Sequence, residues 1–364
     1  MFPRHEGDMH GTFVLDYLKA VEPFCNVTVL DVSISGVCKG VKIEKLGDTT
    51  VYRYTISAGK PGKLLKPLLY MMWFYCGYKA ALTLAPDIIH AHGATLTGTM
   101  ALSAAKKIRA PVVITEHTGP FAKLLAGFLS AHLTKRALER ADAVLVVSDD
   151  LKNQILAAGI TPKKVLVTYN PVNTDLFVPA KRRDMLASRN IVFVGRLENY
   201  KGALRTVKAF RALRVRHYDW TLTIVGDGPE YESIKRLVEA DDLLRGRVTL
   251  KGRLHKEQIA REIQSASFFV MPSEHETFGI SIAEAMACGL PVIVGDETAP
   301  REFVDAESGL LVPATDVGAI AMAMEHLIGH RAEYDVDRIR GKIVTRFGLM
   351  EFGKRLQSVY TGLM

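Results

Sequence analysis

Cysteine is scarce in this sequence, and its pattern excludes several classes of protein. The 364 residues contain four cysteines, with no C-x-x-C pair and no grouping with histidines that would suit zinc. A disulfide framework or a zinc module is therefore not indicated. We expect a chain of the reducing, cytoplasmic compartment.

Long uninterrupted apolar runs are also missing. The opening residues MFPRHEGDMHGTF mix charged and polar side chains and have no apolar centre, which excludes a signal peptide. The most apolar stretch, residues 64–84, is interrupted by two lysines, a proline and a glycine, whereas a spanning helix needs about 20 largely apolar residues. We expect a helix that packs on a sheet, or at most one that dips into a membrane surface.

Three chemical signatures are absent, incomplete or in the wrong structural setting. No Walker phosphate loop occurs, and the turn GDGPEYE (226–232) lacks the third glycine of a dinucleotide fingerprint. A D-x-D triplet at 335–337 lies in the charged, helical stretch EYDVDRIR and not at the end of a strand, so we do not expect it to bind metal. The sequence thus predicts no metal site and no resident cofactor, and a nicotinamide oxidoreductase is disfavoured.

Acidic residues are few in the first half of the chain. Residues 1–170 have 20 lysines and arginines against 13 acids, a net charge of +7 out of +8 for the whole chain. Such a surface attracts an anionic membrane, a phosphorylated substrate or nucleic acid, although a solvated basic face with no partner fits equally well. Few aromatics are interleaved with the charges and no nucleic-acid module is recognised, so no nucleic-acid partner is expected.

Short β-branched runs alternate with helical stretches along the whole chain. This alternation predicts an α/β fold with βαβ units and two parallel sheets of about six strands each. The strands expected in the first half are 27–32, 51–56, 87–92, 111–117, 143–148 and 164–170. Those in the second half are 190–197, 220–228, 247–253, 267–273, 291–296 and 309–314.

The segment 170–189, with prolines, asparagines and a basic run, is the predicted linker. We expect one domain over 1–172, joined by a C-terminal helix at about 350–364, and a second over 173–349. Open parallel sheets bind ligands beyond the carboxyl ends of their strands, so a cleft between the domains should hold the site. Polar residues cluster just after the predicted strands: His92, His117, Ser148, Asn170, Arg196, 226–229, Arg253 and 273–279.

Two segments indicate chemistry most clearly. In VFVGRLENYKG (192–202), Arg196 and Lys201 flank a turn before a helix, a combination that suits a doubly charged diphosphate, although two surface cations fit this segment as well. In PSEHETFGISIAEAMACGLPVI (272–293), Glu276 and Glu284 stand eight residues apart. If that span is mostly helix, about 12 Å of rise separates them, too far for a catalytic carboxylate pair but suited to the two ends of a nucleotide sugar.

Together these residues resemble retaining glycosyltransferases of family 4, also called group 1, whose GT-B fold has two Rossmann-like parallel-sheet domains facing across a cleft. The E-x7-E of 276–284, the turns GRLENYKG and VGDGPE and the strand GLLVP stand in family order, and the resemblance extends from about residue 10 to about 360. It implies that Arg196 and Lys201 bind the donor diphosphate, that Glu276 meets the transferred sugar and that Glu284 holds the ribose.

The resemblance assigns the remaining donor contacts as well. The backbone of Phe278, Gly279 and Ile280 would line the sugar and phosphates, and Arg253 with Leu254 would cradle the nucleobase. In the first domain His117 matches the active-site histidine, and the glycine loop that approaches the donor contains Gly11. His92 and Asn170 are also family positions near the cleft, but the resemblance assigns them no specific role.

Two features depart from the family. A first strand normally precedes the glycine loop, yet here the chain opens in that loop, so either the start is assigned too far downstream or the sheet lacks its first strand. Thr298 and Ala299 stand where two adjacent glycines are common, which leaves the donor sugar open.

The resemblance predicts a metal-independent, retaining transferase that moves a sugar from a nucleotide-sugar donor to a glycan or lipid-linked acceptor. Synthesis of cell-surface polysaccharide or lipopolysaccharide is the expected setting, with possible peripheral binding at the inner face of the cell membrane. Two alternatives remain open. A hydrolysing nucleotide-sugar epimerase of the same fold would release free sugar and nucleotide, and an inactive sugar-nucleotide-binding protein would bind without turnover.

Overall fold

The chain folds into two compact units, which are described separately. A computed structural model describes residues 11–35, 40–57, 66–180, 187–214, 216–217 and 219–364. Residues 1–171 and 352–364 form the first unit, and residues 172–351 form the second. The predicted first-strand departure concerns residues before Gly11 and lies outside the described residues. The predicted cleft between the units stays a prediction.

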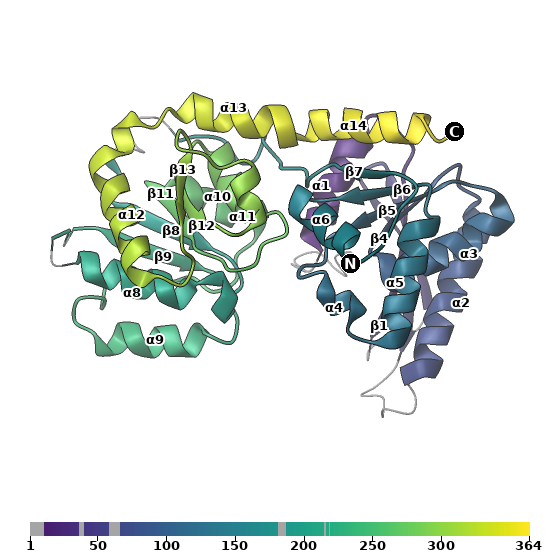
Figure 1. Ribbon diagram of the computed structural model, residues 1–364, viewed down its shortest axis with the longest axis horizontal. Helices are drawn as coiled ribbons and strands as arrows, with labels where there is room; N and C mark the ends of the chain where they lie inside the picture. The colour runs from purple at the N-terminus through teal and green to yellow at the C-terminus, as the bar shows by residue number, and fades with distance from the viewer. Residues whose placement is uncertain (1–10, 36–39, 58–65, 181–186, 215, 218) are drawn as a thin grey trace. The chain divides into compact units, whose positions relative to one another are not determined.

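The described residues of the first unit form two sheets, and Figure 1 labels β1 of one sheet and the four strands of the other. Three strands pair in the order β1-β3-β2, and four parallel strands follow in the order β4-β5-β6-β7. The central strands β5 and β6 are buried at every position, as is typical of β-branched strands covered on both faces. The strand bounds are β1 Thr28–Ser35, β2 Gly40–Leu46, β3 Thr49–Ser57, β4 Ile89–His92, β5 Val112–Glu116, β6 Ala143–Val146 and β7 Val165–Val167.

Helices connect these strands, and one returns from the far end of the chain. The helix α3 packs against both α2 and α5, and α2 also packs against β1. The last helix, α14, places Phe352 against the ring of Tyr17 at 4.7 Å between centroids. The bounds are α1 Thr12–Val21, α2 Lys66–Leu84, the π-helix η1 Ala94–Gly98, α3 Thr99–Ile108, α4 Ala122–Leu125, α5 Phe128–Arg140, α6 Asp149–Ala157 and α14 Leu349–Thr361.

The second unit is built on one six-stranded parallel sheet. Its strands follow the order β10-β9-β8-β11-β12-β13, so the winding direction reverses between β8 and β11. Strands β11 and β12 are buried at every position. The bounds are β8 Asn190–Val194, β9 Thr221–Val225, β10 Val248–Leu250, β11 Phe268–Met271, β12 Val292–Gly295 and β13 Gly309–Val312.

Two groups of helices flank this sheet (Figure 1). The helix α8 packs against α9 and α12, and α11 packs against α10 and α13. In α8 the buried Val207, Phe210 and Leu213 recur at helical spacing, which turns one apolar face towards the sheet. The bounds are η2 Asn199–Lys201, α8 Ala203–Leu213, α9 Tyr231–Ala240, α10 Lys256–Gln264, α11 Ile280–Ala287, η3 Ala299–Glu302, α12 Val317–His330, η4 Arg331–Glu333 and α13 Val336–Phe347.

The α/β class and the parallel sheets are confirmed, with one correction in the first unit. A single sheet of about six strands was expected there, but the described strands form two sheets, and β2 is an additional strand that runs antiparallel to β3. The two-residue turn Gly47-Asp48, with Gly47 at φ 59°, closes this hairpin. Val41 and Ile43 of β2 are 55% and 61% exposed, so the strand lacks the burial that made the others recognisable.

The apolar stretch 64–84 contains the predicted helix, which is α2. Within the described ranges, none of the helices combines the length and the apolar character needed to cross a bilayer.

Candidate functional site

Two of the residues predicted to bind the donor, Lys201 and Glu276, follow the two strands at which the second sheet reverses. Lys201 lies in the turn after β8, and Glu276 lies in the turn after β11, its neighbour across the reversal. The two turns are joined by a hydrogen bond of 2.8 Å from the amide of Glu274 to the carbonyl of Tyr200. Doubly wound sheets bind ligands at this point, beyond the carboxyl ends of the strands.

Lys201 and Glu276 form an ion pair. The ammonium Nζ donates to Glu276 Oε1, and the two side chains are 16% and 9% exposed. Arg205 and Glu274 form a second pair beside it, with 2.8 Å between Nη2 and Oε1. Since an unpaired charge at this depth costs several kcal/mol, Lys201 and Glu276 hold one another in place when no ligand is bound.

Two glycines bring backbone amides to the same place. Gly202, at φ 82°, precedes α8, and a side chain there would meet the carbonyl oxygen of Pro272 at 2.5 Å. Gly279, at φ 85°, precedes α11, and a Cβ would lie 2.9 Å from Ile282 and from Pro300. Two helices therefore begin beside the Lys201–Glu276 pair with free N–H groups, an arrangement that attracts anions.

Arg196 and Lys201 are not equivalent in the structure, although both flank the turn as expected. The Arg196 side chain is 73% exposed and pairs with Glu198 on the same turn.

Arg253 is 58% exposed, with its Nε 3.2 Å from Asp227 Oδ2. Leu254 is half-buried in the loop that follows the edge strand β10. The loop after β9 and the loop after β10 are linked by a hydrogen bond of 2.8 Å from the Gly226 amide to the Gly252 carbonyl.

Glu284 lies inside α11 and is 6% exposed, with Lys256 Nζ 3.4 Å from its Oε1. Only half of the 276–284 span is helical, because α11 begins at Ile280. The estimate of helical rise therefore holds only for the second half of the span, since left-handed Gly279 interrupts the first. Phe278 is 1% exposed and packs on Phe303 and Phe347, so this residue offers only backbone to a ligand.

Thr298 and Ala299, in place of two glycines, lie at the opening of η3 and are 4% and 2% exposed. The Thr298 hydroxyl donates to the carbonyl of Gly295 at 3.1 Å.

The D-x-D aspartate Asp335 caps α13, where its carboxylate accepts the amides of Asp337 and Arg338. Across the described ranges, no three His, Cys, Asp or Glu side chains are grouped as a metal site.

In the first unit, three histidines form a stack: His90 lies within β4, His92 ends that strand, and His117 follows β5. The rings of His90 and His92 lie 4.8 Å apart, and those of His92 and His117 lie 5.3 Å apart, all nearly parallel. His92 Nδ1 is 3.0 Å from His117 Nε2, so one of these nitrogens donates and the other accepts. His90 is held at both ring nitrogens, by Tyr360 and Thr115, each at 2.6 Å.

The loop that carries His117 is fixed by the buried carboxylate of Glu116. This side chain accepts the amides of Ala94, His117 and Thr118 at 2.8 to 2.9 Å. Asn170 also hydrogen-bonds the His117 side chain, and Tyr17 donates to Asn170 Oδ1 at 3.3 Å. Gly11 precedes α1 in the left-handed region, at φ 72°.

The stack holds its histidines neutral. Burial lowers the pKa of His92 to about 4. Burial, reinforced by the neighbouring imidazoles, also lowers the pKa of His90 and His117 well below the usual range. An unprotonated His117 supplies no fixed positive charge, and its Nε2 can accept a hydrogen bond from a substrate hydroxyl group only when that nitrogen is released from His92.

Acidification is therefore expected to destabilise the protein through this stack. Unfolded histidines take up protons below about pH 6.5, while His92 in the folded stack does not until the pH approaches about 4, and the lowered pKa values of His90 and His117 act in the same direction. Stability is then lost as the pH falls, by up to about 1.4 kcal/mol per pH unit for each histidine. Melting temperatures measured from pH 7 to pH 5 should fall more steeply in the wild type than in His92→Asn. The exposed control His132→Asn should follow the wild type, and a flat wild-type profile would contradict the neutral stack.

Several residues of these sites carried no recognisable sequence signal. Tyr360 lies 270 positions from His90, and Lys256 and Glu198 occupy ordinary charged positions. Glu116 was visible only as an acid that ends an apolar strand, a pattern that indicates a role for the strand end but not for the side chain.

Comparison with known proteins supports the resemblance. Residues 25–176 match the model described as Glycosyltransferase Family 4, and residues 188–330 match that of Glycosyl transferases group 1. A GDP-mannose-dependent alpha-mannosyltransferase of Mycolicibacterium smegmatis is 30% identical over 69% of this chain and 67% of its own length. Glycogen synthase of Mycobacterium tuberculosis is 27% identical over 67% of this chain, which spans 60% of the length of that relative.

Solved structures give the same fold. Sucrose-phosphate synthase of Thermosynechococcus elongatus matches with a TM-score of 0.78 and 22% identity, over 97% of this chain and 92% of its own. Anabaena HepE, solved in complex with UDP and glucose, matches with a TM-score of 0.74 and 18% identity, over 97% and 96%. The chain therefore belongs to the group 1, family 4 glycosyltransferases and has their GT-B type of fold, with two α/β units of parallel strands.

Proposed function

We propose that this protein transfers a sugar from a nucleotide-sugar donor to a glycan or lipid-linked acceptor, with retention of anomeric configuration and without a catalytic metal. The observation that carries the proposal is the Lys201–Glu276 pair at the reversal of the second sheet, beside the first residues of α8 and α11. Lys201 and the helix amides would stabilise the departing diphosphate as its charge grows. Glu276 would accept hydrogen bonds from the hydroxyls of the transferred sugar.

The second half of the donor would extend towards Glu284. Its carboxylate suits the ribose hydroxyls, and Lys256 orients it at 3.4 Å. Arg196, which is largely exposed on its turn, would leave Glu198 to meet the diphosphate, while Arg253 and Leu254 would border the nucleobase. HepE has been solved with UDP-glucose, which makes UDP-sugars the first donors to try here, followed by the GDP-mannose of the mycolicibacterial relative.

On the acceptor side we assign the central role to His117. Its ring is oriented by His92 and Asn170, and Glu116 holds the loop. A neutral imidazole in this position can orient an acceptor or donor hydroxyl group. No residue is required as a covalent nucleophile, since the leaving phosphate can take the acceptor's proton in a front-face reaction.

Donor screening tests the proposal. Thermal-shift measurements with a panel of nucleotide sugars should identify one donor that raises the melting temperature, and acceptor trials with that donor should yield a glycoside. NMR of the first product should show the anomer of the donor. Free sugar released without an acceptor would favour the hydrolysing epimerase, and binding without any turnover would favour the inactive protein. An inverted product would contradict the retaining mechanism.

We further propose that the first unit binds a membrane surface at its periphery. Large apolar side chains are exposed on α2 and at the start of α5, two helices that both pack on α3: Met71 is 68% exposed, Tyr75 58%, Phe128 93% and Leu129 68%. Residues 1–170 also carry a net charge of +7. Apolar insertion and attraction to anionic lipid act together in such anchors.

The double variant Phe128→Ser/Leu129→Ser should reduce binding to anionic vesicles at least tenfold, because burying one such side chain contributes about 1.5–3 kcal/mol. Met322→Ser, at an apolar residue of the second unit that is 69% exposed, is the matched control and should bind normally. Reversal of lysines 60, 63 and 66 to Glu should also abolish binding, although their side chains lie outside the described residues. Co-sedimentation at low salt gives the measurement, and a wild type that stays in solution would end the proposal.

A further inference from the structure

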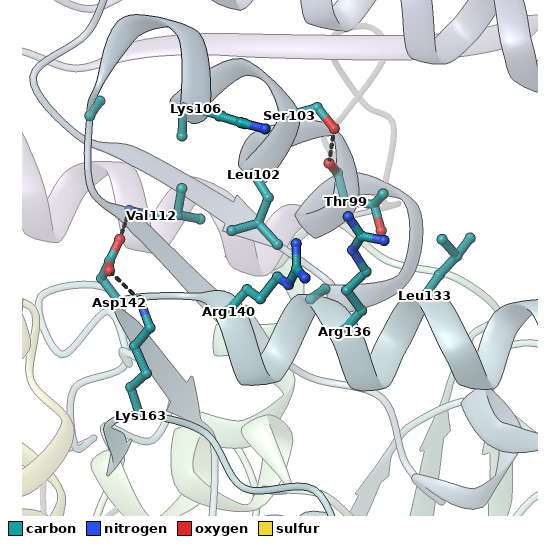
Figure 2. Close-up of a pocket in the computed structure, with 13 residues that line it drawn as sticks. Thr99, Leu102, Ser103, Lys106, Val112, Leu133, Arg136, Arg140, Asp142 and Lys163 are labelled. Atoms are coloured by element: carbon teal, nitrogen blue, oxygen red, sulfur yellow. Dashed lines mark hydrogen bonds and ion pairs between the residues drawn. The ribbon is translucent and has the colours of Figure 1, made fainter.

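A basic cavity of about 550 Å³ lies in the first unit, away from the histidines. Figure 2 shows it between α3 and α5, closed at one side by the amino ends of the parallel strands. Val112 is the first residue of β5, and Asp142 directly precedes β6. His92 and His117 lie at the carboxyl ends of β4 and β5, so the cavity is at the opposite edge of the sheet.

Positive charge exceeds negative charge in the lining. Four cations line the cavity, Lys106, Arg136, Arg140 and Lys163, against the single carboxylate of Asp142. That carboxylate is already engaged, because it accepts the amide of Val112 at 2.9 Å and Lys163 Nζ at 3.0 Å. For the other three cations, the described part of the chain provides no carboxylate within ion-pair distance.

The two arginines have the geometry of an anion site. Arg136 and Arg140 are one helical turn apart on α5, and Figure 2 shows both side chains reaching into the cavity towards α3. Like charges at this spacing destabilise a helix by about 0.2–0.5 kcal/mol, a cost that a bound anion would remove. Guanidinium groups match the oxygens of phosphate in paired hydrogen bonds, and Lys106 would complete the neutralisation from α3.

The rest of the lining favours a ligand whose anionic group is joined to an apolar part. Leu102, Leu133 and Val112 supply apolar surface. The Thr99 hydroxyl donates to the carbonyl of Thr95 in η1, and the Ser103 hydroxyl donates to the carbonyl of Thr99 in α3. Their protons are therefore unavailable to a ligand, and the cations remain as the donors.

Two of the cations also stabilise the helices that carry them. Lys106 and Arg140 lie in the last turns of α3 and α5, where cations interact favourably with the helix dipole.

We propose that this cavity binds the phosphate group of a phosphorylated small molecule or lipid, with an adjoining apolar part against Leu102 and Leu133. The site is separate from the donor site in sequence and in fold, since Lys201 and Glu276 belong to the second unit. It is a second, non-catalytic site for a phosphate ester.

Hydrogen exchange of the full chain tests the proposal with two probes, glycerol 3-phosphate in solution and phosphatidylcholine vesicles that contain phosphatidate. Either probe should protect the last turns of α3 and α5. Arg136→Gln/Arg140→Gln should weaken that protection at least tenfold in apparent affinity. The control Lys107→Gln/Lys164→Gln removes the same charge from positions that are exposed, as Arg136 and Arg140 are, but that do not line the cavity, and it should behave as wild type.

Protection by glycerol 3-phosphate would identify a soluble ligand, and protection by the vesicles alone would identify a lipid headgroup. Vesicle docking through Phe128 would instead protect the first turn of α5, which separates this site from the proposed membrane contact. Equal effects of the two double variants, or no protection of the last turns by either probe, would overturn the proposal. Nucleotide binding should be unchanged in both variants, whichever donor is used.

Discussion

Lys201→Ala is expected to lower the turnover of the donor about 10²-fold or more. Removing one preorganised donor from a site where negative charge develops typically costs this much. The side chain is 16% exposed, so bulk water cannot readily replace the ammonium. Release of nucleotide at saturating donor and acceptor measures the effect, and turnover near that of the wild type would remove Lys201 from the diphosphate site.

Arg205→Ala is the matched control for Lys201→Ala, because it tests whether the loss of a partly buried ion pair is enough to lower turnover. The Arg205 guanidinium pairs with Glu274 at 2.8 Å and is 13% exposed. Arg205 lies in the first turn of α8, directly after the turn that carries Lys201, yet it is not expected to touch the donor. Both variants leave a carboxylate without its partner and should lose comparable stability in thermal melts. A turnover loss confined to Lys201→Ala would support the diphosphate role, whereas equal losses would mean that the loops merely need their ion pairs.

Gly226→Ala is expected to lower the free energy of unfolding by about 3 kcal/mol or more. Gly226 has φ 141°, and a Cβ there would lie 1.8 Å from the carbonyl oxygen of Gly195, a backbone atom that cannot turn aside. The loops after β8 and β9 would have to separate. For a unit of this size the melting temperature should fall about 2–4 °C for each kcal/mol.

Gly246→Ala is the matched control for Gly226→Ala. Gly246 also has a positive φ, 71°, but nothing lies within 4 Å of the position its Cβ would take. Only the backbone strain of about 1–2 kcal/mol then applies. In calorimetry, the melting temperature of Gly226→Ala should lie well below that of Gly246→Ala. Equal melting temperatures would show that the loops after β8 and β9 can move apart at little cost.

The sheets could be predicted where burial made the sequence regular. All twelve predicted strand segments contain strands, because β-branched runs between polar turns have few other structures available to them. The exposed strand β2 was missed, since its apolar residues face solvent and the only local signal was the Gly47-Asp48 turn. The division of the first unit into two sheets depends on pairing across the chain, which periodicity does not encode.

The candidate site was predictable as positions at strand ends but not as contacts. Lys201 and Glu276 were both identified, yet their ion pair spans 75 positions and follows from the strand order β8-β11. Arg196 was grouped with Lys201, whereas Glu198, two residues away, competes for its guanidinium. The stack that contains His117 also contains His90, which is held by Tyr360 of the last helix. A single sequence gives no sign that His90 and Tyr360 are in contact.

The return of α14 to the first unit has a consequence for biosynthesis. Phe352 packs on Tyr17, Tyr360 binds His90, and Gly353 approaches the Ala20 carbonyl so closely that a Cβ would lie 2.0 Å from it. During translation these contacts become available only after residues 172–351 have been made. The second unit can thus fold while the first still awaits its last helix, so the unit that emerges first from the ribosome is the one completed last.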